Sequence, residues 1–187
     1  MCSKNIEFMP DTNDTTLNTP VAEPMIDLDK RPPVEVTEAQ KEQFFKAFLA
    51  DRLYEEEFNL LGGNFRVRLK AFSMRENADL LTQIAYDRDK GKIEGVNDYY
   101  FARVAHYRLG LALVSINDVP FCPELTPDKV PFDKAKGESY VSKRADTFSD
   151  WPMVKMAALQ AALQTFDQRI LVLVDAVAKS DFWKAAA

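Results

Sequence analysis

The sequence predicts an α+β fold that is mainly helical, with about four helices and one β-hairpin (approximately residues 54–72), preceded by an extended N-terminal tail. Three observations predict it: two helix-capping patterns, a glycine pair between two alternating apolar runs, and an apolar heptad repeat near the C-terminus. A hydrophobic content of 47% with 28% charged residues is typical of globular proteins. The 187 residues suffice for one domain and an extension. We therefore expect a tail over residues 1–36 and a single globular domain over residues 37–187.

Residues 1–36 have the composition of an extended or disordered segment. Their five prolines each fix φ and lack a backbone donor, so no long helix or strand is expected. Seven acidic and three basic residues give this tail −4 of the chain's net charge of −5. Composition favours disorder; the alternative is an arm that lies on a neighbouring subunit. The apolar points of such an arm, candidates for partner contact, are Phe8, Met25, Ile26 and Leu28.

The first helix is expected to begin at Thr37. Its hydroxyl can accept from the backbone three residues on, while the side chain of Gln40 reaches back, which is the spacing of a capping box. An apolar stripe follows, formed by Phe44, Phe45, Phe48 and Leu49. Because exposing such a stripe to water is costly, we expect it to be buried in the core or in an interface.

A β-hairpin is expected between Tyr54 and Phe72. Gly62-Gly63 accepts the positive φ of a two-residue turn, and the resulting register sets Phe58 opposite Val67. One face of the hairpin is then apolar, with Phe58, Leu60, Phe65, Val67 and Leu69. The other face pairs Glu57 with Arg68 and Glu55 with Lys70 across the strands. Alternation sends Glu56 to the opposite face from its two neighbours, which argues against a metal-binding carboxylate cluster.

Two helices and a long loop follow the hairpin. Ser73 and Glu76 form a second capping box, which opens a helix that runs towards Gly91. Asn97 or Asp98 caps a third helix, from about Tyr99 to Ile116, whose apolar content on most sides indicates burial at the domain centre. Residues 117–149 contain four prolines and little periodicity. They predict a long loop that wraps the domain or, as the alternative, reaches a partner.

The last helix is expected over residues 150–184, with an acidic cap and Pro152 in its first turn. It carries a heptad line of Met156, Leu159, Leu163, Phe166, Ile170, Leu173 and Val177. This line can pack against the second and third helices. Alternatively, the distal half docks on another chain. The residues expected to contact a partner in that case are Phe166, Ile170, Leu173, Phe182 and Trp183.

Residue types that carry chemistry are sparse in this sequence. His106 is the single histidine and lies within a predicted helix, so a structural role is favoured over a catalytic one. Two distant cysteines, Cys2 and Cys122, with one histidine do not make a zinc site, and they indicate a reducing compartment without disulfides. No phosphate-binding glycine motif is present. We expect no catalytic, cofactor-binding or metal-binding residues.

The charge and hydropathy exclude other classes of function. An acidic tail beside a nearly neutral domain disfavours nucleic acid as a partner, because phosphate binding needs a basic excess. No apolar run approaches the roughly 18 residues that a membrane span needs. The polar first 25 residues do not have the pattern of a secretory signal, so secretion is not expected.

The order of these elements resembles bacteriophage tail proteins of the tail-assembly-chaperone and small baseplate or tail component type. The similarity extends over roughly residues 40–185. The short segments that carry it are Phe65–Lys70, Ser73–Glu76, Tyr107-Arg108-Leu109 and Ser115–Phe121. It implies binding to other phage tail or baseplate proteins in the host cytoplasm, with a place in the virion left open, and no catalytic residues. The acidic N-terminal tail is not part of the family pattern.

We therefore expect a non-enzymatic phage structural or assembly protein that acts by protein–protein contacts, with self-association as a further option. The alternative is a small ligand-binding protein, or an enzyme with an unrecognised carboxylate-based site. A host regulatory adaptor is a third interpretation, which the nearly neutral domain permits without favouring it.

Overall fold

A computed structural model describes residues 34–93 and 98–179, and for residues 98 and 99 it describes the backbone alone. By its internal contacts the chain divides after Pro33, so these residues belong to one unit. They form five α-helices and four strands, which confirms a mainly helical α+β fold. The elements are α1 (Glu38–Leu49), β1 (Glu55–Leu60), β2 (Phe65–Lys70), α2 (Met74–Asp89), α3 (Asp98–Ala112), β3 (Leu113–Ile116), β4 (Val119–Pro120), α4 (Tyr140–Asp146) and α5 (Met153–Ala178).

Some expectations from the sequence fall outside the described residues. They include the tail up to Pro33 and residue 97 as a helix cap. The candidate partner contacts among them are Phe8, Met25, Ile26, Leu28, Phe182 and Trp183. The last residues of the expected tail are described, and Val36 among them packs against the main core.

Both capping boxes expected from the sequence are present. At α1 the hydroxyl of Thr37 accepts from the Gln40 backbone at 3.2 Å, and the Gln40 side chain accepts from the Thr37 backbone at 2.9 Å. Ser73 and Glu76 repeat this arrangement at α2 with the same two distances. Each pair satisfies backbone donors that the first turn of a helix leaves free, so these starts are set locally.

The hairpin has the expected register but a different turn. Glu55 pairs with Lys70 and Leu60 with Phe65, as the apolar alternation requires. The connection is a 3₁₀ turn over Leu61–Gly63 in which Leu61 as well as the two glycines has positive φ, so the expected two-residue turn is wrong.

The expected charge pairs across the hairpin are also replaced. Glu57 lies 3.7 Å from the diagonal Arg66, and Lys70 pairs with Glu76 at the start of α2. Long charged side chains reach neighbours beyond the residue directly opposite them, which is why the register alone does not decide their partners.

The expected third helix is too long by four residues. It ends at Ala112, and Leu113–Ile116 forms β3, which pairs with β2 across an irregularity between Arg68 and Leu69. β4 completes an antiparallel sheet of order β1-β2-β3-β4. Asn117 and Asp118, with φ of 46° and 65°, make the two-residue turn between β3 and β4. The second hairpin therefore arises where the sequence predicted the end of a helix and the start of a loop. The expected loop over residues 117–149 is also wrong at α4, whose buried residues pack in the second core.

One side chain satisfies the carbonyls where α3 ends. Arg144 of α4 donates to the backbone oxygens of Gly110 at 2.6 Å and Leu113 at 2.7 Å. Carbonyls at a helix end have no partner within the helix, and a cation also interacts favourably with the negative end of its dipole. The bonds from Arg144 therefore stabilise the change from helix to strand.

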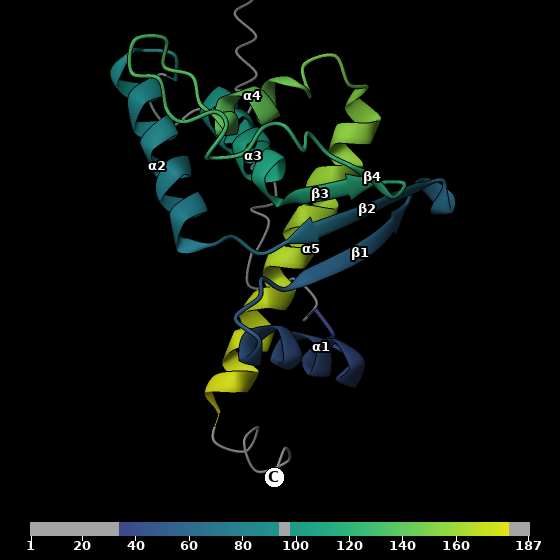
Figure 1. Ribbon diagram of the computed structural model, residues 1–187. Coiled ribbons are helices and arrows are strands. Elements are labelled where there is room, and N and C mark those ends of the chain that lie inside the picture. Colours follow the sequence, from purple (N-terminus) through teal and green to yellow (C-terminus); the bar gives the residue numbers. More distant parts are fainter. Residues whose placement is uncertain (1–33, 94–97, 180–187) are drawn as a thin grey trace, which may run out of the picture. The chain divides into compact units, whose positions relative to one another are not determined.

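The main core lies between the sheet and α5, which runs across one face of the sheet (Figure 1). Residues such as Val67 and Leu69 from β2 meet Leu159 and Phe166 from α5. α1 crosses near the far end of α5 and packs there through Phe44 and Ala47. The heptad line of α5 thus packs inward on α3, β1 and α1.

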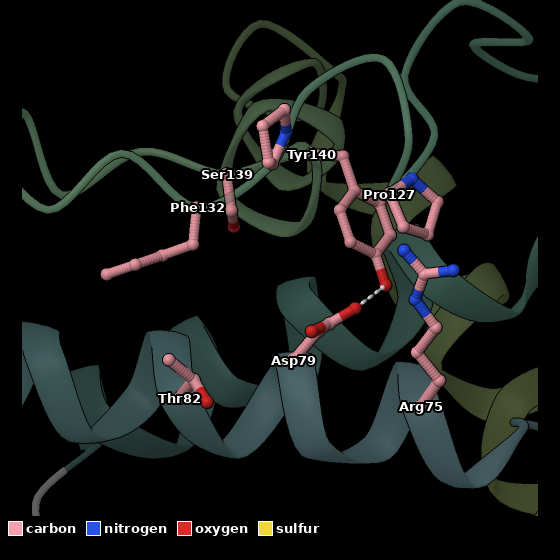
Figure 2. Close-up of a pocket in the computed structure, with 8 residues that line it drawn as sticks. Arg75, Asp79, Thr82, Pro127, Phe132, Ser139 and Tyr140 are labelled. Atoms are coloured by element: carbon pink, nitrogen blue, oxygen red, sulfur yellow. Dashed lines mark hydrogen bonds between the residues drawn. The ribbon is translucent and has the colours of Figure 1, made fainter.

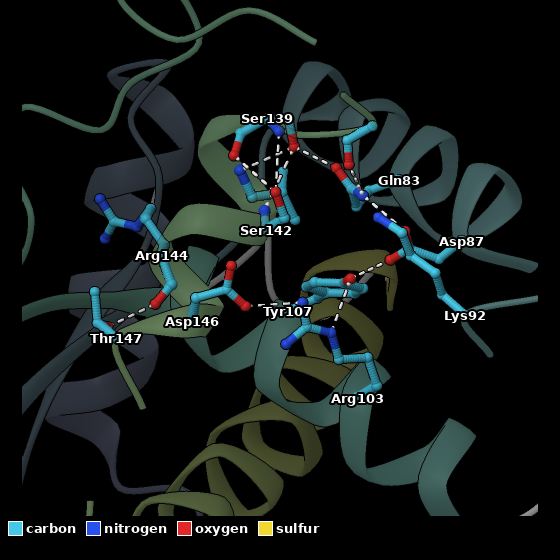
Figure 3. A network of polar contacts seen from close by, with 12 residues as sticks. Gln83, Asp87, Lys92, Arg103, Tyr107, Ser139, Ser142, Arg144, Asp146 and Thr147 are labelled. Atoms are coloured by element: carbon cyan, nitrogen blue, oxygen red, sulfur yellow. Dashed lines mark hydrogen bonds and ion pairs between the residues drawn. The ribbon is translucent and has the colours of Figure 1, made fainter. Parts of the chain in front are cut away.

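A second core joins α2, α3 and α4, and a polar network runs through it (Figure 3). The Tyr107 hydroxyl donates to Asp87, and Gln83 donates to Asp87 at 3.2 Å and to the Gly137 carbonyl at 3.1 Å. Ser139, the N-cap of α4, donates to Gln83 at 2.7 Å. Burial, followed by the hydrogen bond to Asp87, raises the pKa of Tyr107. These groups satisfy one another, so the network holds three helices together.

Gly137 occupies a position that other residues fit poorly. Its φ is +67°, and a Cβ atom built there would lie 1.9 Å from the ring of Tyr86. We expect Gly137→Ala to lower the free energy of unfolding by about 2–3 kcal/mol, from strain at positive φ and displacement of Tyr86. Urea denaturation measures this change. Gly91 also has positive φ but open space around it, so Gly91→Ala is the control and should cost less. Equal costs at the two glycines would contradict the proposed close approach.

Candidate protein-binding surfaces

The described part of the chain has no group of three or more His, Cys, Asp or Glu side chains placed to bind a metal ion. None of the helices described is both long and apolar enough to cross a membrane. His106 lies half-buried on α3, with its ring at 61° to that of Phe148 in an edge-to-face contact, and burial, more than the nearby Arg103, lowers its pKa. Burial is also the main reason that the pKa of the half-buried Cys122 is raised.

A small pocket lies between α2 and the segment that leads into α4 (Figure 2). Its volume is about 120 Å³, below the roughly 300 Å³ at which ligand pockets usually begin. Its polar side chains already have partners: Tyr140 donates to Asp79 at 3.0 Å and Arg75 to Asp128 at 2.9 Å. The carboxylate in this pocket is therefore part of a structural contact between α2 and α4.

The C-terminal end of α1 exposes three large apolar side chains. Phe48 is 53% exposed, Leu49 62% and Leu53, just beyond the helix, 39%. The helix packs inward with Phe44 and Ala47, whereas Phe48 and Leu49 at its C-terminal end stay exposed. Burial of the stripe in the core is wrong for Phe48 and Leu49, and its burial in an interface stays a prediction. We call Phe48, Leu49 and Leu53, together with the hollow that Leu53 also lines, the α1 surface.

The hollow of the α1 surface has a volume of about 680 Å³ and basic side chains. Its apolar lining comes from Ala47, Ala50, Leu53 and Tyr54. Lys46, Arg52 and Lys70 provide three positive charges against the single negative charge of Glu55. Lys46 and Lys70 contact Glu42 and Glu76, whereas the guanidinium of Arg52 has no partner among the residues described. The hollow is therefore apolar at its wall and carries one unpaired cation, Arg52, at its rim.

A second surface lies along α5. One hollow of about 400 Å³ separates α3 from α5, and another of about 250 Å³ lies beside the end of β2; Leu163 and Asp167 line both. We call the two hollows together the α5 groove. The side chains of the first hollow are Phe101, Ala102, Ala105, Arg108, Gln160, Leu163, Gln164 and Asp167. Those that the second adds are Lys70, Ala71, Phe72, Phe166 and Ile170.

An ion pair lies at the centre of the α5 groove. Arg108 of α3 donates to Asp167 of α5 at 2.7 Å, and the two side chains are 40% and 34% exposed. Burial raises the pKa of Asp167, and the positive charge of Arg108 opposes that shift. Leu171 and Val174, 70% and 51% exposed, extend the groove along the same side of α5 because they follow Asp167 and Ile170 by four residues.

The described heptad residues that were expected to contact a partner lie in two different environments, the main core and the α5 groove. Phe166 and Leu173 are each 1% exposed inside the main core, so they are core residues, and the prediction that they meet a partner is wrong for this fold. Ile170 is half-buried and lines the α5 groove. The sequence reasoning missed Leu171 and Val174, although apolar residues outside a heptad line are a signal that could have found them.

Comparisons of the chain with known protein families, with curated proteins and with solved structures found no match.

Proposed function

We propose that this protein is a non-enzymatic bacteriophage structural or assembly protein that binds other tail or baseplate proteins through its α1 surface, in the cytoplasm of the infected host. The resemblance of residues 40–185 to phage tail proteins supports the phage context. The observation that carries the binding role is the exposure of Phe48, Leu49 and Leu53 at the C-terminal end of α1, where Leu53 also lines a hollow with basic side chains.

The apolar part of the α1 surface favours binding to a protein. Each large apolar side chain moved out of water contributes on the order of 1.5–3 kcal/mol. Phe48 and Leu49 stand on a helix whose start is fixed by a capping box and whose inner side is packed on the core. Because the backbone that carries them is held in place before binding, little backbone entropy is lost when a partner covers them.

The charge of the α1 surface indicates the chemistry of the partner. Three basic side chains and one acidic side chain line the hollow, and Arg52 lacks a partner among the residues described. A segment with apolar and acidic side chains would fill the hollow and meet the positive rim, and complementary potentials of this kind steer association and select the partner. The α1 surface therefore fits an acidic, apolar segment of another tail or baseplate protein.

The alternative of a ligand-binding protein or a carboxylate-based enzyme has less support. The pocket beside Asp79 is small, and its carboxylate accepts a hydrogen bond from Tyr140. The larger hollows are open to solvent at the surface, where a small molecule would be poorly enclosed.

Binding to purified proteins tests the proposed function. The full chain is mixed with each tail or baseplate protein encoded next to its own gene, and affinity is measured by calorimetry. Leu49→Asp is expected to weaken binding about 30-fold, the effect of losing about 2 kcal/mol at a hot spot. Leu81→Asp on α2, where Leu81 is 58% exposed, is the control and should bind like the wild type.

Two results would overturn the proposal. One is that none of these proteins binds the wild-type chain. The other is that Leu49→Asp and Leu81→Asp bind equally well while both variants melt like the wild type, because the α1 surface would then have no part in binding.

A further inference from the structure

We propose that the α5 groove is the contact between two copies of this chain, related by a twofold axis that passes close to Arg108 and Asp167. The inference rests on the proposed function in one respect, that the chain acts by protein contacts. It concerns a different surface from the one that we assign to other proteins, so the two proposals can fail separately.

The charges of the α5 groove support a second copy as the occupant. A twofold contact lays the same patch on both subunits against itself, so each charge must meet an opposite charge from the other copy. The centre of the groove carries one positive and one negative side chain, Arg108 and Asp167, already 2.7 Å apart. Two such pairs facing each other place each guanidinium between two carboxylates. The patch is therefore complementary to itself.

Apart from Lys70 at the end of β2, which pairs with Glu76, the rest of the α5 groove is apolar or uncharged. Between α3 and α5 the lining consists of apolar side chains and two glutamines, apart from the central ion pair. Leu171 and Val174 continue this surface along α5. From Gln160 to Val174 the helix is about 20 Å long at 1.5 Å per residue, which allows two antiparallel α5 helices to pack along several turns. Apolar contact of this kind supplies the affinity, and the charges fix the alignment.

The α1 surface gives the contrast that makes the assignment specific. Among the basic side chains of its hollow, Lys46 and Lys70 are paired with glutamates, and Arg52 has no ion-pair partner among the residues described. Two copies placed face to face there would bring two unpaired guanidinium groups together. In the α5 groove every charged side chain is paired, Arg108 with Asp167 and Lys70 with Glu76. The charges therefore assign different partners to the two surfaces. The α5 groove suits a second copy of the chain, and the α1 surface suits an acidic partner.

Charge reversal at the centre of the groove tests the dimer. The mass of the full chain in solution is measured by light scattering and sedimentation, for the wild type and for Arg108→Glu and Asp167→Arg. In each variant the contact gathers four like charges, so the dissociation constant of the dimer should rise at least about 10-fold. Mixing the two variants should restore a one-to-one dimer, because the acidic centre of one then faces the basic centre of the other.

Two further variants keep the test independent of folding. Arg108→Glu combined with Asp167→Arg exchanges the two charges within one chain and should restore the dimer. Leu171→Asp places a charge on an exposed residue outside the ion pair and should weaken the dimer, while its melting temperature stays that of the wild type. The matched control Leu81→Asp should dimerise normally.

A wild-type chain that stays monomeric at the highest concentration it tolerates would overturn the dimer. So would single variants that associate like the wild type, or a mixture of the two that fails to associate. If the wild type is monomeric yet binds a tail or baseplate protein through Leu49, the dimer fails and the proposed function stands. If it dimerises as described but no such protein binds, the proposed function fails.

Discussion

Replacing Arg144 with methionine is expected to lower the free energy of unfolding by about 3–5 kcal/mol, since buried carbonyls left without a partner cost about 1–3 kcal/mol each. Its guanidinium donates to four backbone oxygens, those of Gly110 (2.6 Å), Leu113 (2.7 Å), Cys122 (3.2 Å) and Leu125 (3.4 Å). Burial is the main cause of the lowered pKa of Arg144. Methionine keeps much of the apolar stem but supplies no donor, so the end of α3 and the loop after β4 lose their common partner.

Urea denaturation measures this loss of stability, and two further variants serve as comparisons. Arg68→Met changes an arginine that is exposed on β2, so it should alter stability by no more than about 0.5 kcal/mol. Arg144→Lys should lie between the two, because an ammonium group cannot reproduce the fork of donors in a guanidinium. If Arg144→Met costs no more than Arg68→Met, the bonds to the end of α3 do not stabilise the fold as proposed.

Removing Arg169 is expected to cost about 2–3 kcal/mol, at or just below the lower end of the range for breaking a buried ion pair, because Arg169 is itself 25% exposed. Its partner Glu56 is 8% exposed on the inner face of β1. Besides the guanidinium of Arg169, this carboxylate accepts from Gln40 of α1 at 2.9 Å and from the Tyr54 hydroxyl at 3.4 Å. Arg169→Met would leave a negative charge in the core with only neutral donors.

A double-mutant cycle separates the ion pair from its surroundings. Glu56→Leu combined with Arg169→Met replaces both charges by apolar groups, and it should recover most of the stability lost in Arg169→Met, because no unpaired charge remains. Thermal and urea unfolding of the four proteins provide the measurement. Strictly additive costs would show that the two side chains do not depend on each other.

Glu56 also shows what the alternation of residues along a strand can predict and what it cannot. The pattern of β1 correctly places Glu56 on the opposite face from Glu55 and Glu57, and so excludes a cluster of three carboxylates. That face proves to be the buried one. The partner that makes burial tolerable is Arg169, 113 residues away in sequence. No local rule connects two residues that far apart, since their contact depends on how α5 packs on the sheet.

The candidate surfaces illustrate the same limit. The apolar stripe of α1 and the heptad line of α5 were both visible in the sequence, and each was a candidate for the core or for an interface. The structure buries Phe166 and Leu173 but leaves Phe48 and Leu49 exposed. Which side of an amphipathic helix faces water depends on its neighbours once apolar residues extend around more than one side.

The sequence by itself determined the local features: both capping boxes and the pairing of residues 55–60 with 65–70. In each, the interacting residues are close along the chain and their geometry leaves one solution. Only the tertiary structure decided that residues 113–116 form a strand, because a short apolar run suits a buried strand as well as a buried helix. The pairing of β3 with β2 and the bonds from Arg144 to the end of α3 favour the strand. Both come from segments distant in the sequence, as does the pairing of Arg108 with Asp167 in the α5 groove.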